Sequence, residues 1–306
     1  MHIRFIAFLL PILLTVASPV AADTITVTLI GTGAGPGGGG RGMVGQRNNA
    51  ITLVAAGGLL LVFDAGRGLV AGLARAGYGV VRRADKVFLT HLHSDHVTGL
   101  PDLFISGSHL GRSGPLHLWG PPGTEAMAAH FSKAFAWDIK YRINRRRNLP
   151  SFDARDVAPG RIFEEAGVTV MALAVDHWPP RLGENARGEF PAYGYRVGFA
   201  GRSVVLSGDT RFSKNVIKHA KGADLLIHEV SMITGKGRRS AHHTSPKQAG
   251  EVFRRAAPKL AVFSHIVFGR RNAKTLIRLT GYDGRLVVGE DGMRIEVGEE
   301  VKVIPQ

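Results

Sequence analysis

Short apolar runs separated by glycine, proline and polar residues recur along the chain, a pattern typical of β-strands joined by turns. The first run alternates apolar and polar side chains, as expected of a strand with one buried face. Two later runs flank Gly57 and Gly58 and predict a hairpin. The strands predicted in this way cover residues 24–30, 50–54, 59–63, 86–89, 168–174, 193–199, 203–206, 225–227, 260–263, 285–288 and 293–297.

Helices are predicted at residues 69–76, 124–136, 246–256 and 273–279. Hairpins and strand–helix alternation fill two successive halves of similar character, which favours two mixed sheets packed together. The expected fold class is therefore α/β, a four-layer αββα sandwich with helices on the outer faces. A glycine-dense segment at residues 31–45 lacks the Gly-Lys-Ser/Thr ending of a nucleotide-binding loop, so we interpret it as a loop at the rim of a site.

The first 22 residues are typical of a secretory signal peptide. Arg4 precedes a largely apolar stretch at residues 5–17, and small residues at 20–22 precede Asp23. We expect cleavage after Ala22, which leaves residues 23–306 as one domain, exported and periplasmic if the source is a Gram-negative bacterium. The apolar stretch is short for a bilayer span, so stable membrane insertion is not expected after cleavage; an uncleaved anchor is the alternative.

Composition limits the chemistry that the chain can perform. Its 306 residues are 44% hydrophobic, enough for a sizeable core. The absence of cysteine removes disulfides and thiolate metal ligands. Any zinc site must therefore use His, Asp or Glu, which indicates a catalytic rather than a structural metal.

The formal net charge of +15 predicts anionic partners. Basic residues cluster at 142–147, 236–239 and 270–271, although each cluster alone is also explained as a solvated surface. Few aromatic residues interleave with these clusters, so a stacking surface for single-stranded nucleic acid is not expected. The first expected partner is an anionic small-molecule ester, with nucleic acid as an alternative; a homodimer is also considered.

The segment His91 to His96 places three imidazoles and a carboxylate directly after an apolar run at residues 87–89. A strand that ends in such a cluster presents several metal ligands at one edge of a sheet. Imidazole and carboxylate together suit zinc and similar divalent metals. The alternative, a histidine-rich polar turn, does not account for the further histidines and carboxylates downstream.

Those downstream residues also follow apolar strands. They are His177, Asp209, the pair His228 and Glu229, and His265. A lone histidine of this kind is usually a core or surface residue. Several of them, each placed after a strand, predict a site gathered at one rim of the sheets.

With these motifs in view, the chain resembles the metallo-β-lactamase superfamily, in particular its ribonuclease Z and arylsulfatase-like branch. The matching segments are residues 29–33 (LIGTG), 91–96 (HLHSDH), 207–210 (SGDT), 227–230 (IHEV), 243–249 (HTSPKQA) and 263–265 (FSH). The resemblance covers nearly all of the chain beyond the leader. It implies that residues 23–306 form a metallo-β-lactamase-fold hydrolase domain.

The resemblance also implies two Zn²⁺ ions, with other divalent transition metals as alternatives. One ion would be held by His91, His93 and His177, the other by Asp95, His96 and His265, with Asp209 bridging. A metal-bridging hydroxide would be the nucleophile, and Asp95 would also orient it.

His243 is the candidate to protonate the leaving oxygen, with Glu229 or His228 orienting it. The alternative for His242 and His243 is a polar lead-in to a helix capped by Thr244 or Ser245. Asp64 and Asp176 are expected to support the ligands or form turns rather than bind metal.

Three functions compete at this point. An exported arylsulfatase-like hydrolase is favoured, because residues 118–121 and 175–179 resemble that branch and the leader fits it. The alternative is a ribonuclease Z-like phosphodiesterase or endoribonuclease, although the chain has no long Gly/Pro-rich insert resembling a tRNA-binding arm. The third is a metal- or nucleic-acid-binding protein without turnover.

Overall fold

The computed structural model describes residues 23–35, 47–142, 149–178, 182–183, 186–231, 242–267 and 272–304. The predicted leader and most of the glycine-dense loop lie outside these residues. Within the described ranges, no helix combines the length and the apolar character that crossing a membrane requires.

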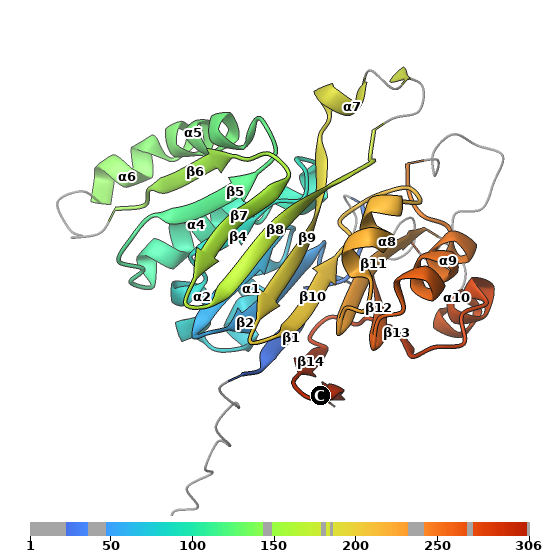
Figure 1. Cartoon of the computed structure of the whole chain (residues 1–306). Coiled ribbons are helices and arrows are strands. Elements are labelled where there is room, and N and C mark those ends of the chain that lie inside the picture. Colours follow the sequence, from blue (N-terminus) through green and yellow to red (C-terminus); the bar gives the residue numbers. More distant parts are fainter. Residues whose placement is uncertain are drawn as a thin grey trace, which may run out of the picture.

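Two mixed β-sheets form the centre of the molecule (Figure 1). The eight-stranded sheet has the order β15 (Val301–Ile304), β14 (Arg294–Val297), β1 (Ile25–Gly31), β2 (Ile51–Ala56), β3 (Leu59–Phe63), β4 (Lys86–Phe88), β5 (Leu116–Gly120) and β6 (Phe152–Asp156). The seven-stranded sheet has the order β13 (Leu286–Val288), β12 (Leu260–Val267), β11 (Leu225–Ser231), β10 (Arg202–Leu206), β9 (Ala192–Phe199), β8 (Val168–Val175) and β7 (Gly160–Glu165).

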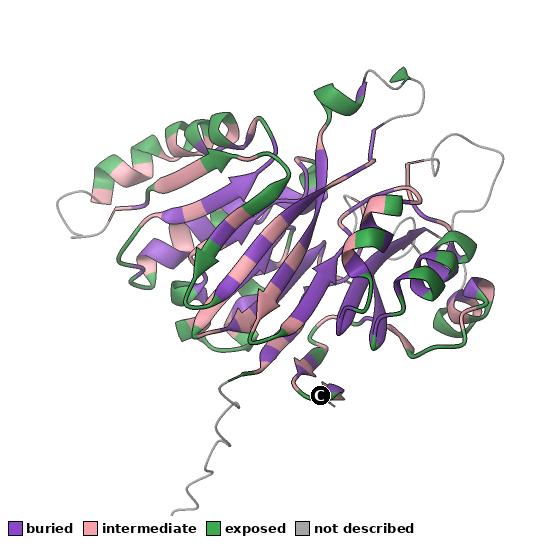
Figure 2. Ribbon diagram, viewed as in Figure 1, coloured by how far each residue is buried: buried purple, intermediate pink, exposed green. Residues whose placement is uncertain are grey.

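The two sheets pack face to face around buried aromatic and aliphatic side chains. Phe63 of β3 and Phe88 of β4 are in contact with each other and with Tyr195 of β9, at ring-centroid distances of 5.1 to 6.0 Å. In β1, Ile25 and Val27 are fully buried between polar neighbours, as the alternating pattern predicted. Figure 2 shows these buried strands inside and exposed helix faces outside.

Helices cover both outer faces, which completes the four layers (Figure 1). The first sheet is covered mainly by α1 (Leu69–Arg75), α2 (Tyr78–Arg83), α4 (Leu100–His109) and α5 (Thr124–Ala134), and the second by α8 (Lys214–Ala220), α9 (Pro246–Ala256) and α10 (Ala273–Thr280). The remaining helices are α3 (Ser94–Val97), α6 (Ala136–Arg142) and α7 (Ala186–Glu189). The predicted αββα sandwich is confirmed.

Several element boundaries differ from the sequence prediction. The expected helix at 124–136 is two helices, α5 and α6, with Phe135 between them. Strands β11 and β12 run beyond their predicted ends, so residues expected to follow these strands lie inside them. The edge strands β6 and β7 were not predicted, because their side chains are mostly polar or exposed and lack an apolar run.

Helix α9 shows how local sequence fixes the segment that precedes it. The Ser245 hydroxyl accepts a hydrogen bond from the Gln248 N–H, and Pro246 occupies the start of the helix, where no N–H is needed. Ser245, one of the two predicted caps, is therefore the N-cap. This cap fixes the chain direction just after His243, which belongs to the site described next.

Candidate metal centre and active site

The predicted ligands converge at the edge where the carboxyl ends of several strands meet. The turn after β4 carries His91 and His93, the turn after β8 carries His177, and the turn after β10 carries Asp209. Strands β10, β11 and β12 are parallel neighbours, as are β3, β4 and β5. Within each sheet the carboxyl ends of these strands therefore lie together, and the contacts between His96 and Asp209 connect the two sheets at this edge.

The first group is formed by His91, His93 and His177. His91 Nε2 lies 2.8 Å and His177 Nε2 lies 3.3 Å from His93 Nδ1. The outer nitrogens are occupied elsewhere: His91 Nδ1 contacts the Thr90 hydroxyl at 3.0 Å, and His177 Nδ1 donates to the His242 carbonyl at 2.9 Å. Burial lowers the pKa of His177 to about 3 and the pKa of His91 well below its usual value. Both rings are therefore neutral, with lone pairs available to a cation.

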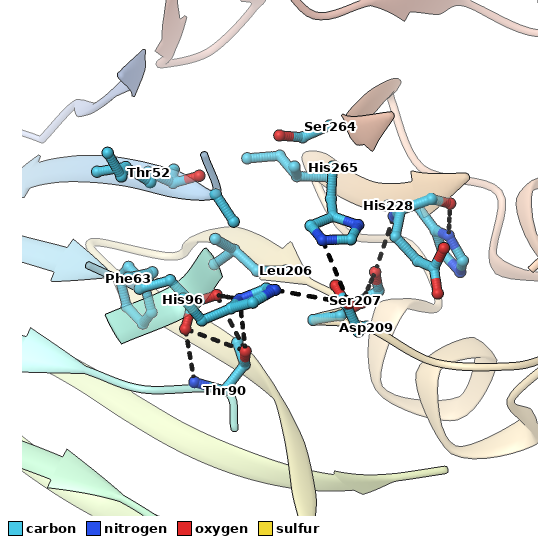
Figure 3. A pocket seen from close by; sticks show the side chains of 16 residues that line it. Thr52, Phe63, Thr90, His96, Leu206, Ser207, Asp209, His228, Ser264 and His265 are labelled. Atoms are coloured by element: carbon cyan, nitrogen blue, oxygen red, sulfur yellow. Dashed lines mark hydrogen bonds and ion pairs between the residues drawn. The ribbon is translucent and has the colours of Figure 1, made fainter. Parts of the chain in front are cut away.

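Asp209 lies at the centre of the site (Figure 3). Its Oδ2 is 3.2 Å from His265 Nε2 and 3.5 Å from His96 Nε2. The same oxygen is 3.5 Å from His177 Nε2 and 3.9 Å from His91 Nε2. Asp209 thus faces both predicted groups, as a bridging carboxylate would.

Asp64 orients the His96 ring through the nitrogen that faces away from the centre of the site. Its Oδ2 lies 2.8 Å from His96 Nδ1, which leaves His96 Nε2 facing the centre. Its Oδ1 accepts from the Thr90 N–H at 2.8 Å. Asp64 has a φ of 60°, in the left-handed region that non-glycine residues rarely adopt. The backbone is held there in the conformation that aims the carboxylate at His96.

A β-bulge directs His265 into the site. Ser264 and His265 of β12 lie opposite the single residue Glu229 of β11, and His265 has a φ of 47°. The bulge places His265 Nε2 3.2 Å from Asp95 Oδ2. Burial would raise the pKa of Asp95, but His265 and the other nearby histidines hold it well below its usual value. Asp95 is therefore ionised.

The buried polar atoms of the site fit a metal. His96 Nε2, Asp209 Oδ1 and His265 Nδ1 are buried and have no hydrogen-bond partner among the described residues. Unpaired buried polar atoms are costly unless a cation or water satisfies them. The ligand atoms of His91, His93 and His177 lie within 4.8 Å of one another, as do those of the second predicted group, Asp95, His96 and His265. Neutral imidazoles with carboxylates are the donors that zinc prefers.

His243 lies beside this centre and is held by a buried carboxylate. Its Nδ1 donates to Glu229 Oε1 at 3.0 Å, and the same oxygen accepts from the Thr210 N–H at 2.8 Å. The His243 ring stacks near that of His265, with centroids 5.7 Å apart. Burial alone would lower the pKa of His243, but the Glu229 carboxylate raises it to about 9. The Glu229 carboxylate therefore favours the protonated, proton-donating form of His243.

His228 lies on the other face of the sheet. Its ring packs edge-on against Phe253 of α9, with centroids 5.8 Å apart, and its Nδ1 donates to the Glu229 carbonyl at 2.7 Å. Adjacent strand residues point to opposite faces, so only one of the pair can face the site. Glu229, and not His228, contacts His243.

The two remaining candidates lie at the border of the site. The His242 ring is next to His177, with centroids 5.0 Å apart, and its ligand atoms fall in a group with His177 and His243. Asp176 forms an ion pair with Arg187 at 2.8 Å and belongs to none of the candidate ligand groups of the described chain.

Backbone amides complete the site, and sequence reasoning missed them. The Gly35 N–H donates to Asp95 Oδ2 at 2.7 Å, which places the stem of the glycine-dense loop against the centre. The Thr210 N–H fixes Glu229. The motif Gly208-Asp209-Thr210 was a usable signal for the second contact, whereas nothing local marks Gly35 as a partner of a residue 60 positions away.

Comparison with known proteins identifies the family. Residues 60–266 match the model of the β-lactamase superfamily domain, and the chain belongs to this superfamily. Its relatives there include ribonuclease Z proteins. That of Mycobacterium marinum is 32% identical over 270 residues, covering 82% of this chain and 93% of the relative. That of Mycobacterium sp. (strain KMS) is 33% identical over 277 residues, covering 85% and 94%.

Solved structures show the same fold. The metallo-β-lactamase fold protein YhfI from Bacillus subtilis has a TM-score of 0.67 at 20% identity, covering 90% of this chain and all of that one. Human tRNase Z, short form, has a TM-score of 0.60 at 21% identity, covering 88% and 98%.

The protein is therefore a metal-dependent hydrolase of ester bonds, similar to ribonuclease Z. The relatives named above are ribonucleases. They support the ribonuclease Z alternative rather than the arylsulfatase prediction that the sequence favoured.

Proposed function

We propose that the protein is a ribonuclease Z-like phosphodiesterase that cleaves RNA. The observation that carries this proposal is His243, held by Glu229 beside the cluster of histidines and carboxylates. A protein that only bound metal would need no such proton donor. The identity to ribonuclease Z proteins over most of both chains supports RNA as the substrate. The net charge of +15 suits a polyanion.

We also propose that the site holds two zinc ions. His91, His93 and His177 would hold one, and Asp95, His96 and His265 the other, with Asp209 shared between them. When bound, the ions supply positive charge for the developing phosphorane and an activated water.

The chain itself supplies the proton for the leaving oxygen. Glu229 favours the protonated form of His243, and this ring lies at the edge of the cluster, where a scissile bond would sit. A ribose oxygen leaves poorly unless it is protonated, so a positioned acid is worth about 10² to 10⁴ in rate. Glu229 keeps the ring in place, since the Thr210 N–H fixes the same carboxylate oxygen.

The predicted leader bears on the substrate. Export of the mature chain, with a periplasmic location in a Gram-negative source, is our proposal for residues 1–22. Precursor tRNA is cytosolic, and an exported enzyme would meet other RNA. We therefore propose the phosphodiester bond of RNA, rather than precursor tRNA in particular, as the substrate.

A panel of substrates tests the proposal. Zinc-loaded protein is incubated with a labelled RNA, bis(p-nitrophenyl) phosphate, p-nitrophenyl phosphate and p-nitrophenyl sulfate. We expect cleavage of the RNA and the diester. Turnover of the sulfate alone would restore the arylsulfatase prediction. Asp209→Asn should lose zinc and activity, while the exposed Asp283→Asn serves as the matched control.

A further inference from the structure

Helix α6 carries a pair of exposed aromatic rings. The side chains of Trp137 and Tyr141 are 76% and 56% exposed, and their rings stack with centroids 5.4 Å apart and planes at 5°. The other two tryptophans of the chain, Trp119 and Trp178, are buried. Large aromatic surface left in water is costly and often marks a place where a partner binds.

The charges around this pair are mainly positive. Lys133 and Lys140 are exposed, one before and one after Trp137. Asp138, the acidic residue of α6, is neutralised by Arg142 at 2.9 Å. Stacked aromatic rings flanked by cations are the elements with which proteins bind single-stranded nucleic acid: the rings stack on bases and the cations contact phosphates.

The helices connect this pair to the active site. A Cβ atom on Gly123, which precedes α5, would lie 3.1 Å from the side chain of Leu92, the residue between His91 and His93. Helix α6 follows α5 along the outer edge of the molecule, beyond β6 (Figure 1). At a rise of about 1.5 Å per residue, and with a break at Phe135, Trp137 lies at most roughly 20 Å from the start of α5. An RNA strand with one bond in the site can span this distance.

We propose that Trp137 and Tyr141, together with Lys133 and Lys140, form a docking surface for the single-stranded RNA that extends from the site past the start of α5. This inference rests on the proposed ribonuclease function and specifies how its substrate is held. The sequence did not suggest a stacking surface, because few aromatics interleave with the arginine clusters. The spacing of four residues on a helix is what brings the two rings together.

Other occupants fit less well. Two side chains provide much less than the roughly 800 Å² per partner of a stable protein interface. A helix that lies in a membrane surface needs a continuous apolar face, whereas the exposed positions around Trp137 include Lys133 and Lys140. RNA is the partner that uses both the rings and the charges.

Binding to metal-free protein separates docking from cleavage. A fluorescein-labelled unstructured RNA is titrated with wild-type protein, Trp137→Ala, Tyr141→Ala and Trp137→Phe, and binding is followed by anisotropy. We expect about 5- to 100-fold weaker binding for the alanine variants and partial recovery for Trp137→Phe. RNA should also quench the fluorescence of the wild-type protein, and most of this quenching should be lost in Trp137→Ala.

Charge and kinetics give two further readouts. Lys133→Ala combined with Lys140→Ala should reduce the salt slope of binding by about 1.4, while Lys302→Ala on the edge strand β15 leaves it unchanged. With zinc-loaded protein, Trp137→Ala should raise KM for RNA and leave turnover of bis(p-nitrophenyl) phosphate as in the wild type.

The outcomes distinguish this proposal from the proposed function. RNA affinity within twofold of wild type in both alanine variants overturns the docking surface, even if RNA is cleaved. Reduced affinity in protein that cleaves no RNA supports the surface and refutes the ribonuclease. If the alanine variants keep their RNA affinity but no longer bind phosphatidylglycerol vesicles, the pair contacts a membrane and the proposal is overturned. If they keep their RNA affinity but no longer dimerise, the pair contacts a second copy of the chain, which also overturns the proposal.

Discussion

Removal of the Asp291 carboxylate should loosen the loop stem that supports the metal centre. Asp291 Oδ1 accepts from the Thr32 N–H at 2.9 Å and the Thr32 hydroxyl at 2.8 Å, and Oδ2 accepts from the Asn48 N–H at 2.6 Å. One carboxylate thus ties together the two strands of chain that flank the glycine-dense loop. From Thr32 the chain reaches Gly35, whose N–H donates to Asp95.

The expected cost of Asp291→Ala follows from these three hydrogen bonds. Thr32 is fully buried, so water cannot replace the acceptor of its N–H, and an unsatisfied buried donor costs about 1 to 3 kcal/mol. Asn48 is partly exposed and water can serve its N–H, which makes that loss smaller. We expect a total loss of about 3 kcal/mol in the free energy of unfolding. Zinc affinity should fall by about 10- to 100-fold, as when a residue that orients metal ligands is removed.

Urea unfolding of the metal-free protein and competitive zinc titration measure the two effects separately. Asp291→Asn keeps one acceptor oxygen and should lie between wild type and alanine in both assays. Asp283→Ala removes an exposed carboxylate nearby in sequence and should change neither. If Asp291→Ala unfolds within about 0.5 kcal/mol of wild type and binds zinc as tightly, the loop stem does not depend on this carboxylate.

Three further predictions concern the acid, the pH dependence of stability and the packing of the helices. His243→Ala should lower kcat on RNA by at least about 100-fold but affect bis(p-nitrophenyl) phosphate much less, because nitrophenolate leaves without a proton. Burial opposes ionisation of Asp224, but Lys259 at 2.7 Å and other hydrogen bonds lower its pKa in the folded protein. The ionised Asp224 therefore stabilises the fold above the unfolded pKa of about 3.9, and this stabilisation is lost as the pH falls through the folded value. Asp224→Asn should reduce the loss of stability that urea unfolding measures at acidic pH. Gly250→Ala should cost about 1 to 3 kcal/mol in urea unfolding, because its Cβ would lie 2.0 Å from the Thr280 carbonyl oxygen between α9 and α10.

Each of these has a matched control in the chain. His219→Ala removes a histidine from α8 and should leave both substrates unaffected. Asp283→Asn should leave the loss of stability at acidic pH unchanged. Gly188→Ala adds a methyl group where no atom lies within 4 Å, and it should be tolerated. An equal loss of kcat on both substrates for His243→Ala would contradict its role as the acid. The same would follow for the other two arguments if Asp224→Asn lost stability at acidic pH as the wild type does, or if Gly250→Ala were as stable as the wild type.

The layers of the fold could be predicted because both sheets are covered on both faces. The parallel strands β10, β11 and β12 are nearly continuous apolar runs, for example Val204 to Leu206. Side chains on one face of these strands pack between the two sheets, and those on the other face pack under the helices. Such apolar runs can be recognised in the sequence without knowing which strands pair with each other. The edge strand β7 has four exposed residues out of six, so its pairing with β8 carries no comparable signal.

The convergence of the ligands could be predicted for a related reason. A side chain that follows an apolar strand must lie at an end of the sheet, and parallel neighbours share that end. Strands β8 and β10 run in the same direction on either side of the antiparallel strand β9, so His177 and Asp209, which follow them, lie at the same edge of the sheet. It does not give Gly35 or Asp291 a role, because their contacts bring together segments 60 and 259 residues apart through backbone amides.

The sequence shows only in part which of Glu229 and His228, adjacent residues of β11, faces the site. Alternation along a strand requires that the two side chains point to opposite faces, so one of them had to be excluded from the site. Ile227 packs between the sheets and Val230 packs under the helices, and this places Glu229 on the site's face and His228 against α9. The strand therefore determines which residue can hold the proton donor. The β-bulge that turns His265 toward the same centre could not be predicted from the sequence. An apolar run does not show at which position two residues of one strand will pair with a single residue of its neighbour.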